Sequence, residues 1–229
     1  MISIIIPTLN EAENIERTLI SLSPLRAHGA EIIVVDGGSE DGTPEIARAY
    51  ADRTVTAPCG RAIQMNAGAA LARGQTLLFL HADSFLPESA DILIARAFAG
   101  TKRVWGRFDI RIDSPHPVLI LVAAMINLRT RLTGIATGDQ AIFVRSEIFK
   151  AMGGYPAIPL MEDIALSSKL RTKSRPISIG RKVTTSARRW HTHGIFRTII
   201  LMWRLRLAYF WGRDTKTLAR LYEGNRRGS

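Results

Sequence analysis

The sequence predicts an α/β fold in which a mostly parallel central sheet carries helices on both faces. Two short runs, at residues 3–6 and 32–35, are rich in β-branched apolar residues, as is typical of strands buried on both faces of a parallel sheet. Segments with helical patterns alternate with strand-like runs over about the first hundred residues, which indicates right-handed crossovers between parallel strands. In such a sheet, ligands bind beyond the carboxyl ends of the strands.

The first predicted unit is a strand at residues 3–6 followed by a helix. Pro7 ends the strand. Asn10 offers a helix N-cap, and Glu13 follows three residues later, as in a capping box. Apolar residues then recur at helical spacing, at Ile15, Leu19 and Leu22. We therefore expect a helix that begins directly after Asn10.

The second unit repeats this order. Its strand, at residues 32–35, ends in Asp36 and leads into a glycine-rich turn at residues 37–42. Thr43 and Pro44 then have the pattern of an N-cap with proline at the first helical position. The next predicted elements are a strand at 53–57, a helix at 62–73, a strand at 76–80 and a helix at 87–97.

The second half of the sequence predicts further strands and helices of the same domain. They are a strand at 104–112, a helix at 117–132, a strand at 141–144 and a helix at 161–170. Glu162 and Asp163 open the last of these helices, where carboxylates favour the positive end of the helix dipole. The final 65 residues are less regular, and we treat them as an extension of a single domain.

Composition and charge exclude some classes and leave others open. The single cysteine, Cys59, excludes a disulfide scaffold. The apolar run at residues 2–6 has no basic region before it and is too short for a signal peptide, so we expect an intracellular protein. Residues 165–229 hold 16 lysines and arginines against two acidic residues, whereas residues 1–164 hold 15 against 18. The basic segment should attract phosphates, on nucleic acid, on an anionic membrane or on a small substrate.

Several common motifs are absent from the sequence. It contains neither the G-x-G-x-x-G pattern after its first strand nor a P-loop, which weakens dehydrogenase and P-loop hypotheses. G-x-S-x-G and H-E-x-x-H are also missing, so serine hydrolases and zincins have no support. The remaining chemical signal is a set of acidic residues at strand ends, notably Asp36 and Asp83.

Four segments resemble family 2 GT-A glycosyltransferases: SIIIPTLNEAENI, IIVVDGGSEDGT, LLFLHAD and the later MED. The segments GRAIQMNAGA, GDQAIF and the region around RRW are similar to a small bacterial subgroup often encoded beside radical-enzyme genes. The resemblance implies a GT-A fold, a UDP- or GDP-sugar donor, a divalent metal and transfer with inversion. It implies a nucleotide-sugar-binding half at 1–100, an acceptor and catalytic half at 101–190, and a basic apolar helical extension at 191–229.

The resemblance places donor contacts at the ends of the first two strands. Asp36 would accept a hydrogen bond from the nucleotide base, although aspartate at this position also suits a turn. Pro7, Thr8 and Glu11 would lie beside the base and ribose, and helix capping is the alternative for them. Arg61, near the start of a helix, would meet donor phosphate together with the helix N-terminus, unless it is a surface arginine.

Further donor and metal contacts follow from the same resemblance. Gln64 and Asn66 are candidates for contact with the base or sugar. Asp83 stands where the family's D-x-D motif ends and would bind Mn²⁺ or Mg²⁺ on the donor diphosphate. His81 replaces the first aspartate of that motif. The carboxylate of Asp83 and the imidazole of His81 would form a softer pair of ligands, which tolerates Mn²⁺. Packing or hydrogen bonding is the alternative for His81.

Inverting transfer needs a base that takes the proton of the acceptor hydroxyl. The family takes it from the acidic pair Glu162 and Asp163, and we predict Asp163 as the base, with helix capping as the alternative. Like charges side by side raise the pKa of one carboxylate. Asp139 is a candidate acceptor contact, and Arg189 and Trp190 resemble part of a Q-x-x-R-W acceptor motif. His191 and His193 would share one face if this segment were a strand.

Two hypotheses from other classes remain. A nucleic-acid or anionic-membrane binding module would use the basic C-terminal segment and its aromatic residues, but the acidic balance of residues 1–164 makes nucleic acid the weaker partner. A nucleotidyltransferase would need a glycine-rich loop after the first strand, but residues 7–11, which occupy this place, contain no glycine. The apolar stretch at 194–212 contains arginines and should not span a membrane. It should pack on the domain, pair in a homodimer or dock at the inner membrane surface.

Overall fold

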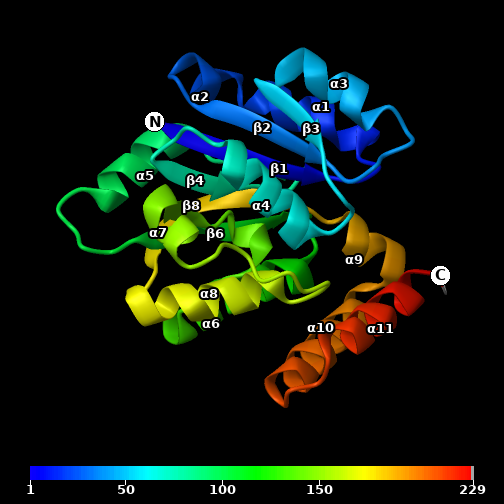
Figure 1. The fold of residues 1–229 in the computed structure, drawn as a ribbon. Helices are drawn as coiled ribbons and strands as arrows, with labels where there is room; N and C mark the ends of the chain where they lie inside the picture. The colour runs from blue at the N-terminus through cyan, green and yellow to red at the C-terminus, as the bar shows by residue number, and fades with distance from the viewer. Residues whose placement is uncertain (228–229) are drawn as a thin grey trace.

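The computed structural model describes residues 1–227 and contains one central sheet (Figure 1). The strand order is β3-β2-β1-β4-β7-β6-β8-β5. The strands are β1 (Ile2–Thr8), β2 (Glu31–Asp36), β3 (Arg53–Thr56), β4 (Thr76–Phe79), β5 (Ser84–Phe85), β6 (Trp105–Asp113), β7 (Phe143–Arg145) and β8 (Ile177–Ser186). Strands β1 to β4 are parallel, β7 is antiparallel to β4 and β6, and β8 is parallel to β6. The predicted mostly parallel α/β sheet is confirmed.

The helices cover both faces of the sheet. They are α1 (Ala12–Ser21), α2 (Ser23–Ala27), α3 (Thr43–Tyr50), α4 (Arg61–Leu71), α5 (Ala90–Phe98), α6 (Pro117–Thr133), α7 (Ser146–Ala151), α8 (Glu162–Lys173), α9 (Arg188–His193), α10 (Ile195–Phe210) and α11 (Thr215–Arg227), with a 3₁₀ turn, η1, at Gly138–Gln140. Ile4 and Ile6 of β1 pack with α1 on one face, whereas Ile5 packs with α4 on the other. This division follows from the alternation of side chains along a strand.

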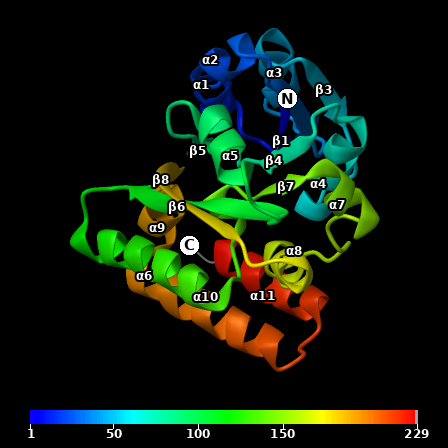
Figure 2. The ribbon, with the colours of Figure 1, turned by 90° about the vertical axis from the view of Figure 1, so that its left-hand side faces the viewer.

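The C-terminal helices form a separate layer at one end of the sheet (Figures 1 and 2). Helix α6 packs on β6 through Leu119 and Ala123, and Ile195 at the start of α10 joins the same cluster. Leu205 of α10 and Leu218 of α11 pack against Ile164 of α8. Helices α8, α10 and α11 therefore share one small core. Within the described residues, no helix is long and apolar enough to cross a membrane.

Several local predictions need correction. Asn10 does not cap α1: its backbone is left-handed, with φ 54°, and its side chain accepts a bond from the backbone N–H of Glu40 instead. Glu11 is the N-cap residue, and the side chain of Asp41 receives the first free N–H of the helix, at Ala12. Residues 87–89 lie before α5 rather than in it. The predicted helix at 87–97 is therefore displaced toward its C-terminal end.

The region after residue 164 is more regular than its sequence indicated. It contains the long strand β8 and three further helices. His191 and His193 lie on the helix α9, so the strand geometry considered for them is wrong. The short elements β5 and α7 carried no signal strong enough to predict them, because a two-residue strand and a six-residue helix are set by tertiary packing.

Candidate active site

The carboxyl ends of β1 and β2 meet at Thr8 and Asp36, which are partners in the parallel register. The carboxylate of Asp36 accepts the backbone N–H groups of Gly38 and Ser39, both at 2.8 Å, and the hydroxyl of Thr8 at 3.3 Å. Asp36 is only 1% exposed. Asp36 therefore builds the turn that follows β2, which is the alternative that its sequence context left open.

The side-chain amide groups of Gln64 and Asn66 form hydrogen bonds with the backbone of the protein itself. The Nε2 of Gln64 donates to the carbonyl oxygens of Thr8 and Val35, both at 2.8 Å, and so ties the ends of β1 and β2 to α4. Asn66 exchanges two hydrogen bonds, each 2.9 Å long, with the backbone of Tyr155. These contacts satisfy both residues without a ligand, so the structure gives them bracing roles in place of the predicted contact with base or sugar.

Glu11 connects the first strand with the C-terminal helices. Its two carboxylate oxygens accept hydrogen bonds from one guanidinium nitrogen of Arg188, at 2.9 and 3.0 Å. Arg188 opens α9, so this pair links the start of α9 to the segment between β1 and α1. Pro7, the next-to-last residue of β1, is buried.

A cleft lies between the sheet edge and the C-terminal helices. Its walls come from α4, the end of β4, η1, α8 and the helices α9 to α11, and it is lined by Arg61, His81, Thr137, Gly138, Asp139, Leu160, Met161, Glu162, Asp163, Ile164, Arg189, Met202, Arg206 and Tyr222. Six of the predicted site residues are therefore brought together: Arg61, His81, Asp139, Glu162, Asp163 and Arg189. Carboxylates and arginines face each other across this cleft.

His81 and Asp139 form one polar pair in the cleft. Nδ1 of His81 lies 3.1 Å from Oδ1 of Asp139. Burial opposes ionisation of Asp139, but His81, Arg189 and Arg61 outweigh burial and lower the pKa of its carboxyl. Position 138 has to be glycine, because a Cβ there would lie 2.6 Å from Nε2 of His81. Both ring nitrogens of His81 thus face η1, so the ring orients Asp139 and is poorly placed as a metal ligand.

Asp83 follows β4 and is half-buried. None of the described residues forms a hydrogen bond or ion pair with its carboxylate. A half-buried carboxylate without a partner fits a hard cation such as Mn²⁺ or Mg²⁺. No group of three metal-ligating side chains gathers anywhere in residues 1–227, so most ligands of such a cation would have to come from the donor diphosphate and water.

Glu162 and Asp163 begin α8, after Met161, whose backbone is left-handed at φ 68°. Burial, and then the negative charge of Asp163, raise the pKa of Glu162 to about 7. Asp163 accepts the backbone N–H of Gly138 at 2.8 Å, which joins α8 to η1. The raised pKa expected for one member of this pair is therefore found at Glu162.

Arg61 is the first residue of α4 and has no hydrogen-bond or ion-pair partner among the residues described. Arg61 keeps an exposed surface, as the alternative of a surface arginine expected. The protein atoms around its guanidinium oppose its charge, but Glu162 and the other carboxylates of the cleft outweigh this effect and raise the pKa of Arg61. The guanidinium of Arg189 lies 5.2 Å from the ring centroid of Tyr222. Both cations are therefore available to an anionic ligand in the cleft.

The structure separates Trp190 from its predicted neighbours. Trp190 packs on the apolar cluster of β6 and α6 and does not line the cleft, so its predicted contact with an acceptor is not supported. Arg206 and Tyr222 line the cleft instead and were missed. Arg206 belongs to the stretch at 194–212, whose apolar residues predicted a packing or docking helix. The sequence does not show which arginine of that stretch turns inward, because the tertiary arrangement of α8, α10 and α11 decides it.

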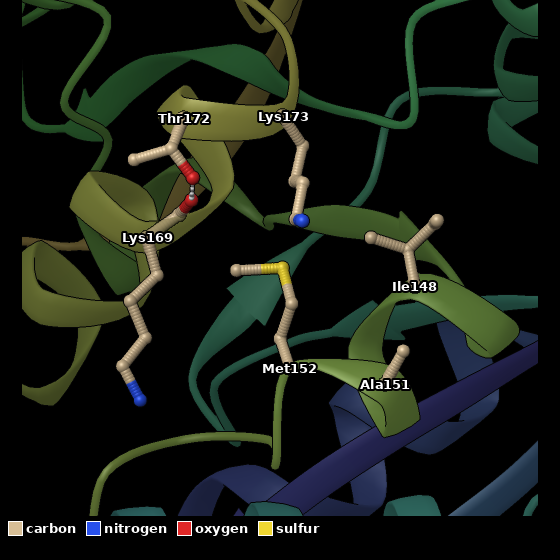
Figure 3. Close-up of a pocket in the computed structure, with 6 residues that line it drawn as sticks. All are labelled: Ile148, Ala151, Met152, Lys169, Thr172 and Lys173. Carbon is tan, nitrogen blue, oxygen red and sulfur yellow. Dashed lines mark hydrogen bonds between the residues drawn. The ribbon is translucent and has the colours of Figure 1, made fainter.

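A second hollow lies between α7 and the C-terminal end of α8 (Figure 3). Met152 and Ile148 form its apolar side, and Lys169 and Lys173 stand on α8. The hydroxyl of Thr172 bonds to the carbonyl oxygen of Lys169 within the helix. The residues that line this hollow include no carboxylate, and it lies at the opposite end of α8 from the start of that helix, so it carries no sign of the chemistry found in the cleft.

Comparisons with known proteins agree with this geometry. A model of the family described as "Glycosyl transferase family 2" matches residues 3–144. A PGL/p-HBAD biosynthesis glycosyltransferase of Mycobacterium tuberculosis is 39% identical over 166 residues, which is 68% of this chain and 63% of the relative. The glycosyltransferase AglE of Haloferax volcanii is 47% identical over 51 residues, 21% of this chain and 17% of that protein. The chain thus spans less than two thirds of the length of these relatives.

Solved structures support the same fold. Staphylococcus aureus TarS 1-349 in complex with UDP has a TM-score of 0.67 and 20% identity, covering 81% of this chain and 60% of that chain. A mannosyltransferase from Pyrobaculum calidifontis, in complex with GDP-Man and Mn²⁺, has a TM-score of 0.65 and 21% identity, covering 90% of this chain and 60% of that chain. At this level of identity the likeness concerns the fold alone.

Proposed function

Because the chain belongs to glycosyl transferase family 2 and has the GT-A fold of its structural neighbours, we propose that it transfers a sugar from a UDP- or GDP-sugar to an acceptor, with inversion. The cleft carries this proposal, since it places a buried carboxyl with a pKa of about 7, that of Glu162, in one chamber with the guanidinium of Arg61. In this proposal residues 1–100 bind the donor, residues 101–190 bind the acceptor and hold the base, and residues 191–229 form the extension.

The donor base would lie at the ends of β1 and β2, beside Pro7, Thr8 and Glu11. A ring N–H could share the carboxylate of Asp36, whose position is already fixed by the turn at Gly38. Arg61, at the N-terminus of α4, would meet the diphosphate, where both its guanidinium and the helix dipole favour negative charge. UDP and GDP-Man are bound in two structural neighbours, which supports these two bases as the first to test.

A divalent cation, Mn²⁺ or Mg²⁺, would be held by Asp83 and by the donor diphosphate. Bound there, it would neutralise charge that develops on the leaving diphosphate. Asp83 alone supplies a hard oxygen, and His81 would act indirectly through Asp139. Neighbouring structures contain Mn²⁺ with GDP-Man and Mg²⁺ with UDP.

Asp163 would act as the base of the transfer. Its carboxylate takes the proton of the acceptor hydroxyl as that oxygen attacks the anomeric carbon, and the nucleoside diphosphate leaves from the opposite face, which inverts the configuration. Gly138 and the start of α8 hold Asp163 in place. Glu162, with its pKa of about 7, is protonated in part of the molecules at neutral pH and limits the negative charge beside the base.

A nucleotide panel tests the proposal. Thermal unfolding is measured with UDP, GDP, TDP and CDP, with and without Mn²⁺, because a ligand at about 100 times its Kd adds about 2.7 kcal/mol of stability. We expect a shift with one uridine or guanosine nucleotide, increased by Mn²⁺. Absence of any shift, combined with strong binding to RNA or DNA, would favour the nucleic-acid binding module instead.

The metal site has its own matched variants. Asp83→Ala is expected to abolish the effect of Mn²⁺ on nucleotide affinity in calorimetry, with the fold intact, because Asp83 is not part of the core. Glu147→Ala is the control, since Glu147 is exposed on α7, away from the cleft. An unchanged Mn²⁺ effect in Asp83→Ala would remove Asp83 from the metal site.

The outer face of α6 and α10 supports a peripheral membrane location, which we also propose. On α6, exposed apolar residues recur at helical spacing, at Leu121, Met125, Leu128 and Leu132. On α10 they recur in the same way, at Phe196, Ile200, Trp203, Leu207 and Phe210. Exposed basic residues of the same layer, such as Arg197, Arg204 and Arg213, would meet anionic headgroups.

Vesicle sedimentation tests this location. We expect binding to anionic but not to zwitterionic vesicles, and release by high salt. Two copies joined through the same face would instead appear as a dimer in analytical ultracentrifugation without lipid, and that result would replace the membrane proposal. Retention on membranes after an alkaline carbonate wash would contradict peripheral attachment.

A further inference from the structure

Three arginines each carry one buried guanidinium atom without a hydrogen-bond partner among the described residues. Arg107 lies on β6, Arg129 on α6 and Arg206 on α10, and we call them the arginine row. The Nε atom of each is buried and lacks a hydrogen-bond partner among the described residues. A buried donor of a charged group without a partner destabilises the folded state, so the row requires an explanation.

Arg107 has a charged protein partner, whereas the other two members do not. Arg107 pairs with Asp109, which also pairs with Arg131. Neither Arg129 nor Arg206 forms an ion pair within the part of the chain that the structure describes, and Arg129 donates one hydrogen bond, of 3.5 Å, to the hydroxyl of Thr130. The apolar clusters around α6 and α10 do not need a charge at these positions. The unsatisfied charge is therefore concentrated at Arg129 and Arg206.

The electrostatics agree with this description. Burial, with the positive charges of Arg206 and Arg107, lowers the pKa of Arg129 to about 10, while Asp163 opposes the shift. Burial also lowers the pKa of Arg206, opposed by Asp163 and Asp139. The two cations thus repel each other and are both attracted to the carboxylate that we propose as the base. An anion between them would remove this repulsion.

The location separates these arginines from the donor phosphates. Arg61 and Arg206 both line the cleft, Arg61 from α4 and Arg206 from α10. Helix α4 lies beside the parallel strands and α10 lies in the C-terminal layer (Figure 1). Asp163 lines the same cleft. In an inverting transfer the acceptor stands on the side of the base and the diphosphate stands opposite. The position of Arg206 therefore corresponds to the acceptor.

We propose that Arg206 binds a phosphoryl group of the acceptor next to Asp163 in the cleft, and that Arg129, which does not itself line the cleft, adds a second positive charge to this subsite. The planar guanidinium groups can each give two parallel hydrogen bonds to phosphate oxygens. The proposal rests on the transferase function above and deepens it by naming the acceptor class. The phosphoryl group can belong to a small phosphorylated acceptor or to a lipid headgroup that reaches the cleft along α6 and α10.

Thermal shift with inorganic phosphate tests the subsite, at constant ionic strength set with chloride. Wild type should be stabilised by phosphate both without nucleotide and with saturating UDP or GDP, because the two sites are separate. Arg129→Gln and Arg206→Gln should weaken phosphate binding about tenfold or more, as expected for a lost charge-assisted pair. Arg220→Gln, at an exposed arginine of α11, is the matched control and should bind phosphate as wild type does.

The stability of the variants without phosphate gives a second measurement. Removing an unpaired buried cation should leave the melting temperature unchanged or raise it, whereas loss of a structural arginine would lower it. Arg206→Lys keeps the positive charge but loses the planar guanidinium that can give two parallel hydrogen bonds. This variant should therefore bind phosphate with intermediate affinity, even if the glutamine variant folds poorly. Phosphate shifts that are equal in wild type and in both glutamine variants would overturn the proposal.

Vesicles distinguish the two sources of the phosphoryl group. If the terminal phosphate monoester of a lipid enters the subsite, Arg206→Gln should weaken binding to phosphatidylcholine vesicles that contain phosphatidic acid. It should not weaken binding to vesicles that contain phosphatidylserine, whose phosphate is a diester. An effect limited to inorganic phosphate indicates a small soluble acceptor. If no nucleotide binds but phosphate binding still depends on Arg129 and Arg206, the transferase proposal fails and the subsite remains. If a nucleotide binds but phosphate binding does not depend on Arg129 or Arg206, the subsite proposal fails and the transferase proposal remains.

Discussion

The parallel part of the molecule and its C-terminal layer treat polar side chains in opposite ways. In the parallel region, formed by β1 to β4 and α4, Asp36, Gln64 and Asn66 bond to the surrounding backbone. In the helical region, formed by α6 and α8 to α11, Arg129 and Arg206 keep unsatisfied atoms and the outer face is apolar. The parallel region leaves one buried hydroxyl, that of Thr54, without a partner, whereas the helical region leaves buried atoms of charged groups without partners.

The largest expected effect concerns the base, at the point where the two regions meet. Asp163→Asn should lower kcat by a factor of about 10² to 10⁴, as for loss of a general base, and leave donor affinity almost unchanged. Steady-state kinetics and calorimetry with the nucleotide measure the two quantities. An equal loss of donor affinity would give Asp163 a structural or donor-binding role. The two regions would then not differ at Asp163 in the way described above.

Glu162 offers a test of unsatisfied charge in the helical region. Its pKa is raised to about 7, by burial first and then by Asp163, so the carboxyl ionises less readily in the folded protein than in the unfolded chain. Wild type should therefore lose up to about 3 kcal/mol of stability as the pH rises from about 4.5 to above 7. Glu162→Gln cannot ionise and should be the more stable protein at pH 8.

Urea unfolding of wild type and Glu162→Gln at pH 5 and pH 8 measures this difference. The advantage of the variant should be large at pH 8 and fall below about 1 kcal/mol at pH 5. Parallel pH profiles for the two proteins would mean that Glu162 is not the source of the dependence. Glu147→Gln serves as the control for removal of an exposed carboxylate.

Gln64 tests the opposite behaviour in the parallel region. Gln64→Ala removes the bonds to the carbonyl oxygens of Thr8 and Val35 and leaves both strand ends with one partner fewer. We expect a loss of about 2 kcal/mol in the free energy of unfolding. Gln75→Ala, at an exposed glutamine, should change it by less than about 0.5 kcal/mol. A neutral Gln64→Ala together with weaker nucleotide binding would return Gln64 to the donor site.

The smallest effect is expected at the ion pair that joins the two regions. The side chain of Arg188 is 48% exposed in its pair with Glu11, and exposed pairs contribute at most about 1 kcal/mol. Arg188→Ala should therefore change stability by less than this amount, and added salt, at a concentration on the order of 0.5 M, should remove the difference from wild type. A loss of several kcal/mol would show that this pair holds the helical region in place.

The sequence predicted the parallel region well because local patterns control it. Buried strands of this kind require runs such as residues 32–35, and the glycine-rich turn at 37–42 marks the end of that strand. The prediction that Pro7 ends the first strand was wrong, because β1 continues through Pro7 to Thr8. The predicted strand ends brought Asp36 and Asp83 to the same edge of the sheet. The cap of α1 was wrong because the side chain of Asp41, from another turn, supplies what Asn10 was expected to supply. Such substitution of partners leaves no local signal.

The site was only partly accessible to the same reasoning. Arg61, Asp139, Glu162 and Asp163 lie together as expected, since motifs located them at element ends. Arg206 and Tyr222 were missed because an amphipathic pattern does not tell which polar residue turns toward a cleft built from other helices. Gln64 and Asn66 were placed on the donor by resemblance to the family, and the local sequence does not show that their amides bond to the backbone.

The contact between Glu11 and Arg188 joins positions 177 residues apart, and this separation has a consequence during synthesis. A ribosome adds about 5–20 residues per second and domains fold from the N-terminal side, so Glu11 waits on the order of ten seconds or more for its partner. Tyr222 completes the cleft later still. Strands β1 to β4 can pair while the chain is still growing, but a competent cleft exists only once the helices that follow β8 have been made. A stalled or shortened chain would consequently contain the parallel region but not the complete cleft.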